Sequence, residues 1–101
     1  MPAVARKGGV DTVSTGHPCD GTTVTDEGSS DVFVNSSGIV RLGDLQQVHN
    51  ILVGNSCVPH ALTLSSCSSS VFVNARGAGR LGDSYGGEVL TSGSETVFFG
   101  G

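Results

Sequence analysis

The most constraining feature of the sequence is an internal repeat. Residues 28–44 read GSSDVFVNSSGIVRLGD and residues 67–83 read CSSSVFVNARGAGRLGD, and 11 of the 17 aligned positions are identical without a gap. A truncated copy, GSETVFFGG, occupies residues 93–101, and a diverged counterpart of the other half, VARKGG, occupies residues 4–9. The repeat predicts three units of one kind, joined by loops of different length.

The repeat also changes the meaning of the composition. The chain has 16 glycines among 101 residues and is rich in serine, which without a period would indicate disorder. Because the repeat puts these residues at fixed places, we expect them to serve as turn residues. The length fits a single domain over residues 1–101, with no extension domain.

Each full copy of the repeat predicts a β-hairpin. Residues 31–35 form a short run of β-branched and aromatic residues, which is typical of a strand. A turn at residues 36–38, with glycine at positive φ, and a second strand at residues 39–42 are expected to follow. Helical periodicity with caps is absent, and residues 45–53 are expected to form a single helical turn at most. We therefore predict a mostly β fold with little helix.

Charge and hydropathy exclude several classes of protein. The formal net charge is -4, with five Lys and Arg, which argues against a nucleic-acid-binding surface. No apolar run approaches the length of a membrane span. Arg6 and Lys7 lead into Gly8 and Gly9 and not into the apolar segment of a secretory signal. We expect synthesis in a bacterial cytoplasm, where the three cysteines would not form disulfides.

A chain with this pattern needs a crosslink to stabilise its fold. Three hairpins with about one phenylalanine each bury little apolar surface, and small domains of this kind are commonly held by a disulfide or a metal. Because disulfides are not expected, a bound metal ion is the remaining crosslink.

The candidate ligands are histidines and cysteines, all of which lie between residues 17 and 67. The preferred set is His17, His49, Cys57 and His60, because it uses every histidine and joins the first loop to the second. Cys57 and His60 form a C-x-x-H pair, whose spacing lets a turn present a thiolate and an imidazole to one ion. This set favours one structural zinc ion.

Two alternatives for the thiolate stay open. Cys19 could replace Cys57, and Cys67 is also available. Cys67 occupies the repeat position of Gly28 and Gly93, which favours its interpretation as a small buried thiol.

Other motifs favour structural roles over catalysis. In the segments Arg41–Asp44 and Arg80–Asp83, the aspartates are expected to cap loop N–H groups and the arginine stems to cover the core. Residues 77–82 match G-x-G-x-x-G but lie within a hairpin, which argues against nucleotide binding. A Cys57–His60 nucleophile pair would lack a third orienting group, so we do not expect an enzyme.

The sequence resembles PAAR-repeat proteins, the spike-tip proteins of contractile phage tails and type VI secretion systems. The resemblance rests on the N-terminal P-A-V-A-R, the repeated S-x-x-V-F-V-N…R-L-G-D, the terminal V-F-F-G-G and the histidine-bearing loops. It covers the whole chain and is greatest to the short form found on phage tails. The sequence departs from the family pattern in two ways. First, G-I-V-R and G-A-G-R replace the Pro-Ala-Ala-Arg tetrapeptide that gives the family its name. Second, Gly9 stands where the full copies have Asp44 and Asp83.

The resemblance implies a cone-shaped fold of three hairpin units with zinc near its apex. Its ligands fall on His17, His49, Cys57 and His60. The family implies a flat base that sits on a trimeric β-helical spike protein, one tip per trimer, and a virion component that helps pierce the target cell's outer membrane. Neither nucleic acid nor a small-molecule substrate is implied. Alternatives are a type VI tip that recruits effectors and a small zinc-dependent hydrolase, which would need an open metal position.

The V-F-V segments are candidates for the base, because they recur once per unit and alternate as half-buried strands do. Either of the two alternating sets of side chains can face the partner. The first set is Val32, Val34, Val71, Val73, Val97 and Phe99, and the second is Phe33, Phe72 and Phe98. In both cases we expect an apolar patch larger than a monomer ordinarily exposes.

Overall fold

The fold is built from short antiparallel strands. The computed structural model describes residues 1–100, and within them it contains ten strands and no helix. A four-stranded sheet has the order β2-β1-β10-β9, and three separate hairpins are β3–β4, β5–β6 and β7–β8. The strands are β1 Thr12–Ser14, β2 Thr22–Val24, β3 Phe33–Val34, β4 Ser37–Gly38, β5 His49–Val53, β6 Ser56–His60, β7 Phe72–Val73, β8 Arg76–Gly77, β9 Ser84–Tyr85 and β10 Glu88–Leu90. The prediction of a mostly β fold with little helix is confirmed. Gly101, the last residue of the third copy, lies outside the described residues.

The hairpins β3–β4 and β7–β8 come from the two full repeats, but their turns begin earlier than predicted. Asn35 and Ser36 have φ values of 52° and 68°, and both positions of a type I′ turn need positive φ. Asparagine tolerates this conformation better than most residues. Gly38 therefore lies in β4 and not in the turn. It is needed there for space, because a Cβ atom on Gly38 would collide with the carbonyl oxygen of Ser29.

A ring of three backbone hydrogen bonds joins the units at the centre of the molecule. Ala5 donates to the carbonyl of Gly79 at 3.0 Å, Gly79 donates to Val40 at 2.7 Å, and Val40 donates to Ala5 at 3.0 Å. Each of these residues precedes the arginine of its unit. The three units are thus related by a pseudo-three-fold axis through this backbone ring.

Side chains repeat the same cyclic connection outside the backbone ring. Asn74 Oδ1 accepts hydrogen bonds from Ser29 Oγ at 2.7 Å and from Arg41 Nη1 at 3.0 Å. The equivalent contacts join Asn35 to Ser94 and Arg6, and Gly100 to Ser68 and Arg80. The third unit has Gly100 where the others have asparagine, and its backbone carbonyl takes the place of the side-chain oxygen.

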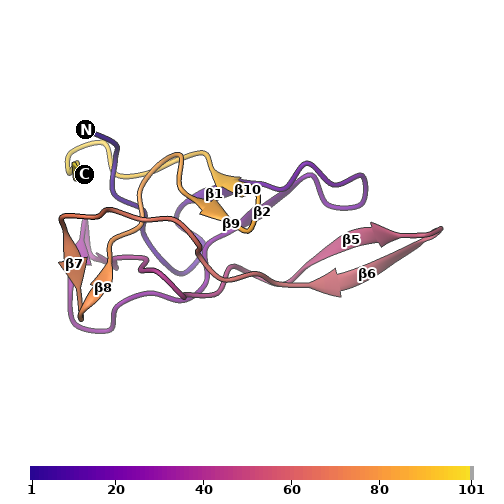
Figure 1. Ribbon diagram of the computed structural model, residues 1–101, viewed down its shortest axis with the longest axis horizontal. Helices are drawn as coiled ribbons and strands as arrows, with labels where there is room; N and C mark the ends of the chain where they lie inside the picture. The colour runs from indigo at the N-terminus through magenta and orange to yellow at the C-terminus, as the bar shows by residue number, and fades with distance from the viewer. Residues whose placement is uncertain (101) are drawn as a thin grey trace.

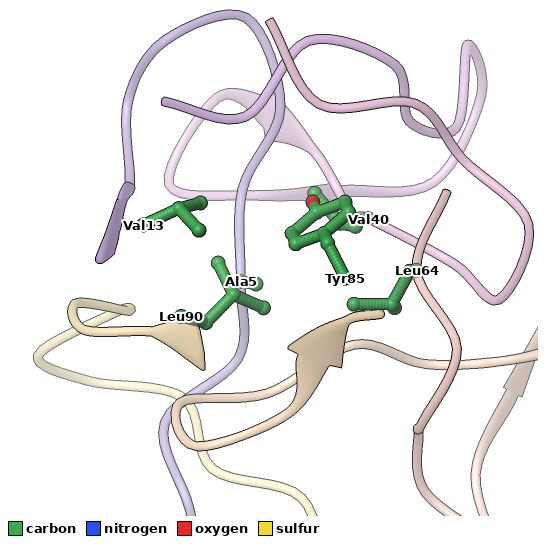
Figure 2. Packing of buried hydrophobic residues seen from close by; sticks show 6 residues of the cluster. All are labelled: Ala5, Val13, Val40, Leu64, Tyr85 and Leu90. Atoms are coloured by element: carbon green, nitrogen blue, oxygen red, sulfur yellow. The ribbon is translucent and has the colours of Figure 1, made fainter. Parts of the chain in front are cut away.

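Two small apolar clusters surround the backbone ring. The first contains Ala5, Val13, Val40, Leu64, Tyr85 and Leu90, whose side chains point toward one another in Figure 2. The second contains Val4, Val34, Ile39, Val73 and Ala78, with Val71, Val97 and Phe99 packed against it. Tyr85 is the one aromatic residue among the buried members of the two clusters, which agrees with the expectation of a core that buries little.

The hairpin β5–β6, which we call the tip hairpin, forms one end of an elongated molecule of 41 × 24 × 23 Å (Figure 1). Five residue pairs from His49–His60 to Val53–Ser56 join its strands. Gly54, with φ of 61°, begins the turn between them. Residues 45–53, for which at most a single helical turn was expected, contain no helix, and residues 49–53 form β5 and pair with β6. Hairpin β7–β8 and both chain termini lie at the opposite, broader end (Figure 1).

The structure decides which parity of the V-F-V segments is buried. Val34 and Val73 are buried in the second cluster, and Val71, Val97 and Phe99 pack against it. The side chains of Phe33, Phe72 and Phe98 are 55%, 62% and 44% exposed. These three residues, one from each unit, are called the phenylalanine face below. Val32 has the same parity as Val34 but is 37% exposed. The alternation therefore buries Val34 and Val73 and does not bury every valine of this set.

Candidate metal centre

Three histidines and one glutamate converge at the root of the tip hairpin. His49 begins β5, His60 ends β6, and the two form a cross-strand pair. His17 lies in the loop after β1, and Glu88 begins β10. One ligand atom from each of these four residues can be chosen so that all four lie within 4.8 Å of one another. This set is called the His–Glu cluster below.

The carboxylate of Glu88 lies at the centre of the cluster. His17 Nε2 and His60 Nε2 lie 2.7 and 2.9 Å from its Oε2 atom. His49 Nε2 lies 3.0 Å from Oε1. The Glu88 side chain is only 3% exposed, so this charge is almost removed from water. Burial opposes its ionisation, but the contacts with His60, His17 and His49 outweigh it and lower the pKa of Glu88 below its ordinary value.

The tautomer of His49 leaves its Nε2 atom available to a cation in the cluster. Its Nδ1 atom lies 3.0 Å from the carbonyl oxygen of Gln47, which can only accept a hydrogen bond. Nδ1 must therefore carry a proton, and in the neutral ring Nε2 presents a lone pair toward the Glu88 carboxylate. Two electron-rich atoms at this separation repel each other unless the ring is doubly protonated or a cation lies between them. An imidazole fixed through Nδ1–H to a carbonyl is also the common arrangement of a metal-bound histidine.

The residues present fit a metal ion. Three imidazole nitrogens and one carboxylate oxygen provide four donors of the types that zinc accepts in tetrahedral sites. They come from three segments that are distant in sequence, the loop after β1, the tip hairpin and β10. A metal ion held here would tie all three together.

Cys57 is not part of the cluster, which corrects the predicted ligand set. Its sulfur is bonded to Cys19, and the two α-carbons are 6.0 Å apart. The prediction that the cysteines remain unpaired is wrong for this pair. The loop after β1 runs beside β5, where Asp20 and Asn50 hydrogen-bond to each other, and this places Cys19 next to β6.

Cys67 is the free cysteine among residues 1–100, and it is half-buried. A Cβ atom on Gly77 would collide with its sulfur, so the thiol fills the space beside the strand β8. The prediction of a small buried thiol is therefore confirmed only in part, because Cys67 packs within the repeat but is not fully buried.

Glu88 is the ligand that sequence reasoning missed, because only histidines and cysteines were considered. A signal did exist. The three variable loops lie between repeat segments that meet around one axis, so each loop can supply a ligand. Within the third loop, residues 84–92, Glu88 is the one acidic, histidine or cysteine side chain.

The arginine–aspartate pairs stabilise the units. Asp44 Oδ2 accepts hydrogen bonds from the backbone N and the Nε atom of Arg41, at 2.8 and 2.9 Å, and Asp83 binds Arg80 in the same way. The aspartates therefore cap the arginines' own N–H groups as well as pairing with their side chains. The predicted capping role is confirmed, with this addition.

The first unit has the same pair despite the glycine at the aligned position. Arg6 donates to Asp11 from its backbone N at 2.7 Å and from Nε at 3.0 Å. Asp11 stands two residues beyond Gly9 and takes the position of the aspartate of the full copies. It is completely buried, and although burial opposes ionisation, Arg6 and Ser92 lower the pKa of Asp11 below its ordinary value.

No family model matches the chain, and a search of curated proteins finds no significant relative. Residues 1–100 contain no helix that is long and apolar enough to cross a bilayer.

Proposed function

We propose that this protein is a tip of the PAAR-repeat kind, which caps a trimeric β-helical spike in a contractile injection machine of the phage-tail type. The observation that carries the proposal is the backbone ring of Ala5, Val40 and Gly79. It gives one short chain three equivalent units around an axis. On this proposal the protein is a virion component that helps to pierce the target cell envelope.

The pseudo-three-fold axis matches the symmetry of the proposed partner. A homotrimer presents three identical surfaces around its end, and a single chain fits them when it offers three similar surfaces of its own. The phenylalanine face provides one exposed aromatic ring per unit. Exposed apolar groups repeated in this way are typical of a binding surface, and aromatic residues are enriched at the centres of protein interfaces.

The His–Glu cluster supports a structural role for the metal, which we propose is zinc. Four protein donors complete a tetrahedral site and leave no position for a substrate, as in structural zinc sites. Since the core is small, the binding free energy of the metal would add to the stability of the fold. This arrangement favours a mechanical tip over the alternative of a small zinc-dependent hydrolase.

The proposal is tested by charging the two faces of the repeat hairpins separately. Phe33→Asp combined with Phe72→Asp should abolish co-purification with the trimeric spike protein of the same gene cluster, while metal content and the unfolding transition stay close to those of the parent. Val34→Asp combined with Val73→Asp should unfold the protein, because both valines are buried. If the phenylalanine double variant is folded and still binds the spike with parental affinity, the proposed docking face is wrong.

A further inference from the structure

The end of the tip hairpin carries exposed apolar side chains that the preceding account does not use. Leu52 and Val53 are 44% and 55% exposed and directly precede the turn at Gly54. The hairpin lies at the end of the molecule opposite to hairpin β7–β8 and the termini (Figure 1). These two side chains therefore sit at the leading end of the long axis, where the fold offers them no partner surface.

The tip hairpin and the residues that flank it contain no acidic side chain and no basic side chain other than histidine. Aspartate, glutamate, lysine and arginine are all absent from residues 45–75, although the chain has 14 of them in total, the sum of five basic and nine acidic residues. Two acids contact the hairpin, and both do so near its root: Glu88 lies against His49 and His60, and the carboxylate of Asp20 accepts a hydrogen bond from the backbone N of Asn50 at 2.7 Å. The outer half of the hairpin is thus uncharged, and its exposed Leu52 and Val53 stand beside the polar Asn55 and Ser56.

The hairpin is attached to the rest of the molecule at two places. The disulfide joins Cys57 in β6 to Cys19, and the His–Glu cluster binds both strands at the root. Two-stranded hairpins are marginal on their own in water, so these attachments keep the turn projecting. The apolar side chains are consequently presented outward and are not free to fold back onto the core.

The geometry favours lipid over a protein as the partner of this turn. A stable protein interface buries about 800 Å² on each side, which exceeds what a two-residue turn and its neighbours offer. Addition of a further strand to β6 is hindered because Pro59 has no N–H group to donate. A bilayer needs neither a wide contact nor strand pairing. It accepts an uncharged apolar projection into its interfacial region.

We propose that the turn of the tip hairpin inserts into the interfacial region of a lipid bilayer, with the side chains of Leu52 and Val53 reaching the acyl chains. The inference rests on the proposed function, since it names the element of the tip that meets the target membrane. The outer edges of the two strands have unpaired backbone groups, which hydrocarbon does not satisfy, so insertion stops at the turn. Because the turn is uncharged, binding depends little on lipid charge and on salt.

The chain has no tryptophan, which permits a clean reporter. Val53→Trp should show a shift of emission to shorter wavelength on titration with phosphatidylcholine vesicles, and quenching by lipids brominated on their acyl chains. The same response is expected at low and high salt. The matched reporter Phe72→Trp, exposed at the other end of the molecule, should show neither effect.

A second substitution tests whether the fluorescence shift depends on Leu52, and a second measurement uses the protein without the reporter. Leu52→Asp in the Val53→Trp background should abolish the shift, whereas Leu81→Asp, at a residue that is 41% exposed outside the hairpin, should preserve it. In the unaltered protein, vesicles should slow amide hydrogen exchange at residues 52–55. Absence of both the Val53→Trp response and this protection would overturn the inference, as would an equal response from Phe72→Trp. Spike binding measured on the same Leu52→Asp protein separates the two proposals: retained binding leaves the proposed function standing even when lipid insertion fails.

Discussion

The backbone N of Gly79 donates a 2.7 Å hydrogen bond to the carbonyl oxygen of Val40, and this bond closes the backbone ring on which the three units meet. A Cβ atom at residue 79 would lie 2.9 Å from Leu64 Cδ2 and 3.1 Å from the same Val40 oxygen. Glycine is thus required by the close approach of two chains at the axis. The residue belongs to G-A-G-R, the segment that aligns with G-I-V-R of the other full copy.

Gly79→Ala should destabilise the protein by about 1–3 kcal/mol, because the added methyl group must displace Leu64 or the backbone of Val40. Urea unfolding followed by far-ultraviolet circular dichroism measures the change. Gly21→Ala is the matched control, since its nearest neighbour would be 3.8 Å away, and it should leave the free energy of unfolding nearly unchanged. Equal stability of the two variants would show that the ring tolerates a side chain at this place.

Glu88→Gln should weaken metal binding by at least about tenfold, since it replaces an anionic ligand by a neutral amide of the same shape, and loss of an outer-shell partner alone costs about that much. Competition with a zinc chelator of known affinity measures the effect. Glu95→Gln, at an exposed residue outside the cluster, should bind the metal as the parent does. If the parent protein, purified without chelators, contains no transition metal, the candidate metal centre is not a metal site.

Cys57→Ser should retain the metal and lose stability, because Cys57 forms a disulfide and does not belong to the His–Glu cluster. The two bonded cysteines are 38 positions apart in the sequence. Loss of such a crosslink lowers the free energy of unfolding by about 2–4 kcal/mol. Elemental analysis and urea unfolding provide the two readouts. Cys67→Ser, which alters a free thiol, should keep both the metal and the disulfide. A Cys57→Ser protein that has lost its metal would restore Cys57 as the ligand.

Asp11→Asn should destabilise the protein at neutral pH by about 1.5–3 kcal/mol, since the buried carboxylate accepts charge-assisted hydrogen bonds from Arg6. The folded-state pKa of Asp11 is lowered, so its contribution is fully present above the ordinary value of 3.8. It is lost as the pH falls below that value and through the folded-state pKa. Unfolding of both proteins in excess chelator, at pH 7 and at pH 3, should show the difference shrinking at the lower pH. A constant difference, or an equal effect from Asp26→Asn at an exposed carboxylate, would contradict this account.

The repeat was sufficient to predict the hairpins of the two full copies, because alternation and β-branched residues act locally. The third copy forms no hairpin of its own and instead pairs with the N-terminal segment through a bridge between Phe98 and Ala3. The repeat was not sufficient to place the turn at Asn35 and Ser36. Gly38 had the signature of a turn residue, but it is required by the backbone of Ser29 from another segment. The outward orientation of Phe33 was equally undetermined, because both parities of V-F-V are apolar.

The metal site was predictable in its histidines and not in its fourth ligand. All three histidines meet, as expected, but Cys57 is drawn to Cys19 by the path of the loop beside β5. Glu88 reaches the cluster through the pairing of β10 with β1, a contact between the two ends of the chain that no local pattern encodes. Tertiary proximity of this kind is what the sequence alone leaves open.

The central claim is that one chain with three pseudo-equivalent units caps a homotrimer. The most direct measurement is the mass of the complex between this protein and the trimeric spike protein of the same gene cluster, by light scattering coupled to size exclusion with the tip in excess. The account predicts one tip chain per spike trimer, because the three units of one chain occupy all three equivalent surfaces. A complex with three tip chains per trimer, or no complex at all, would contradict it.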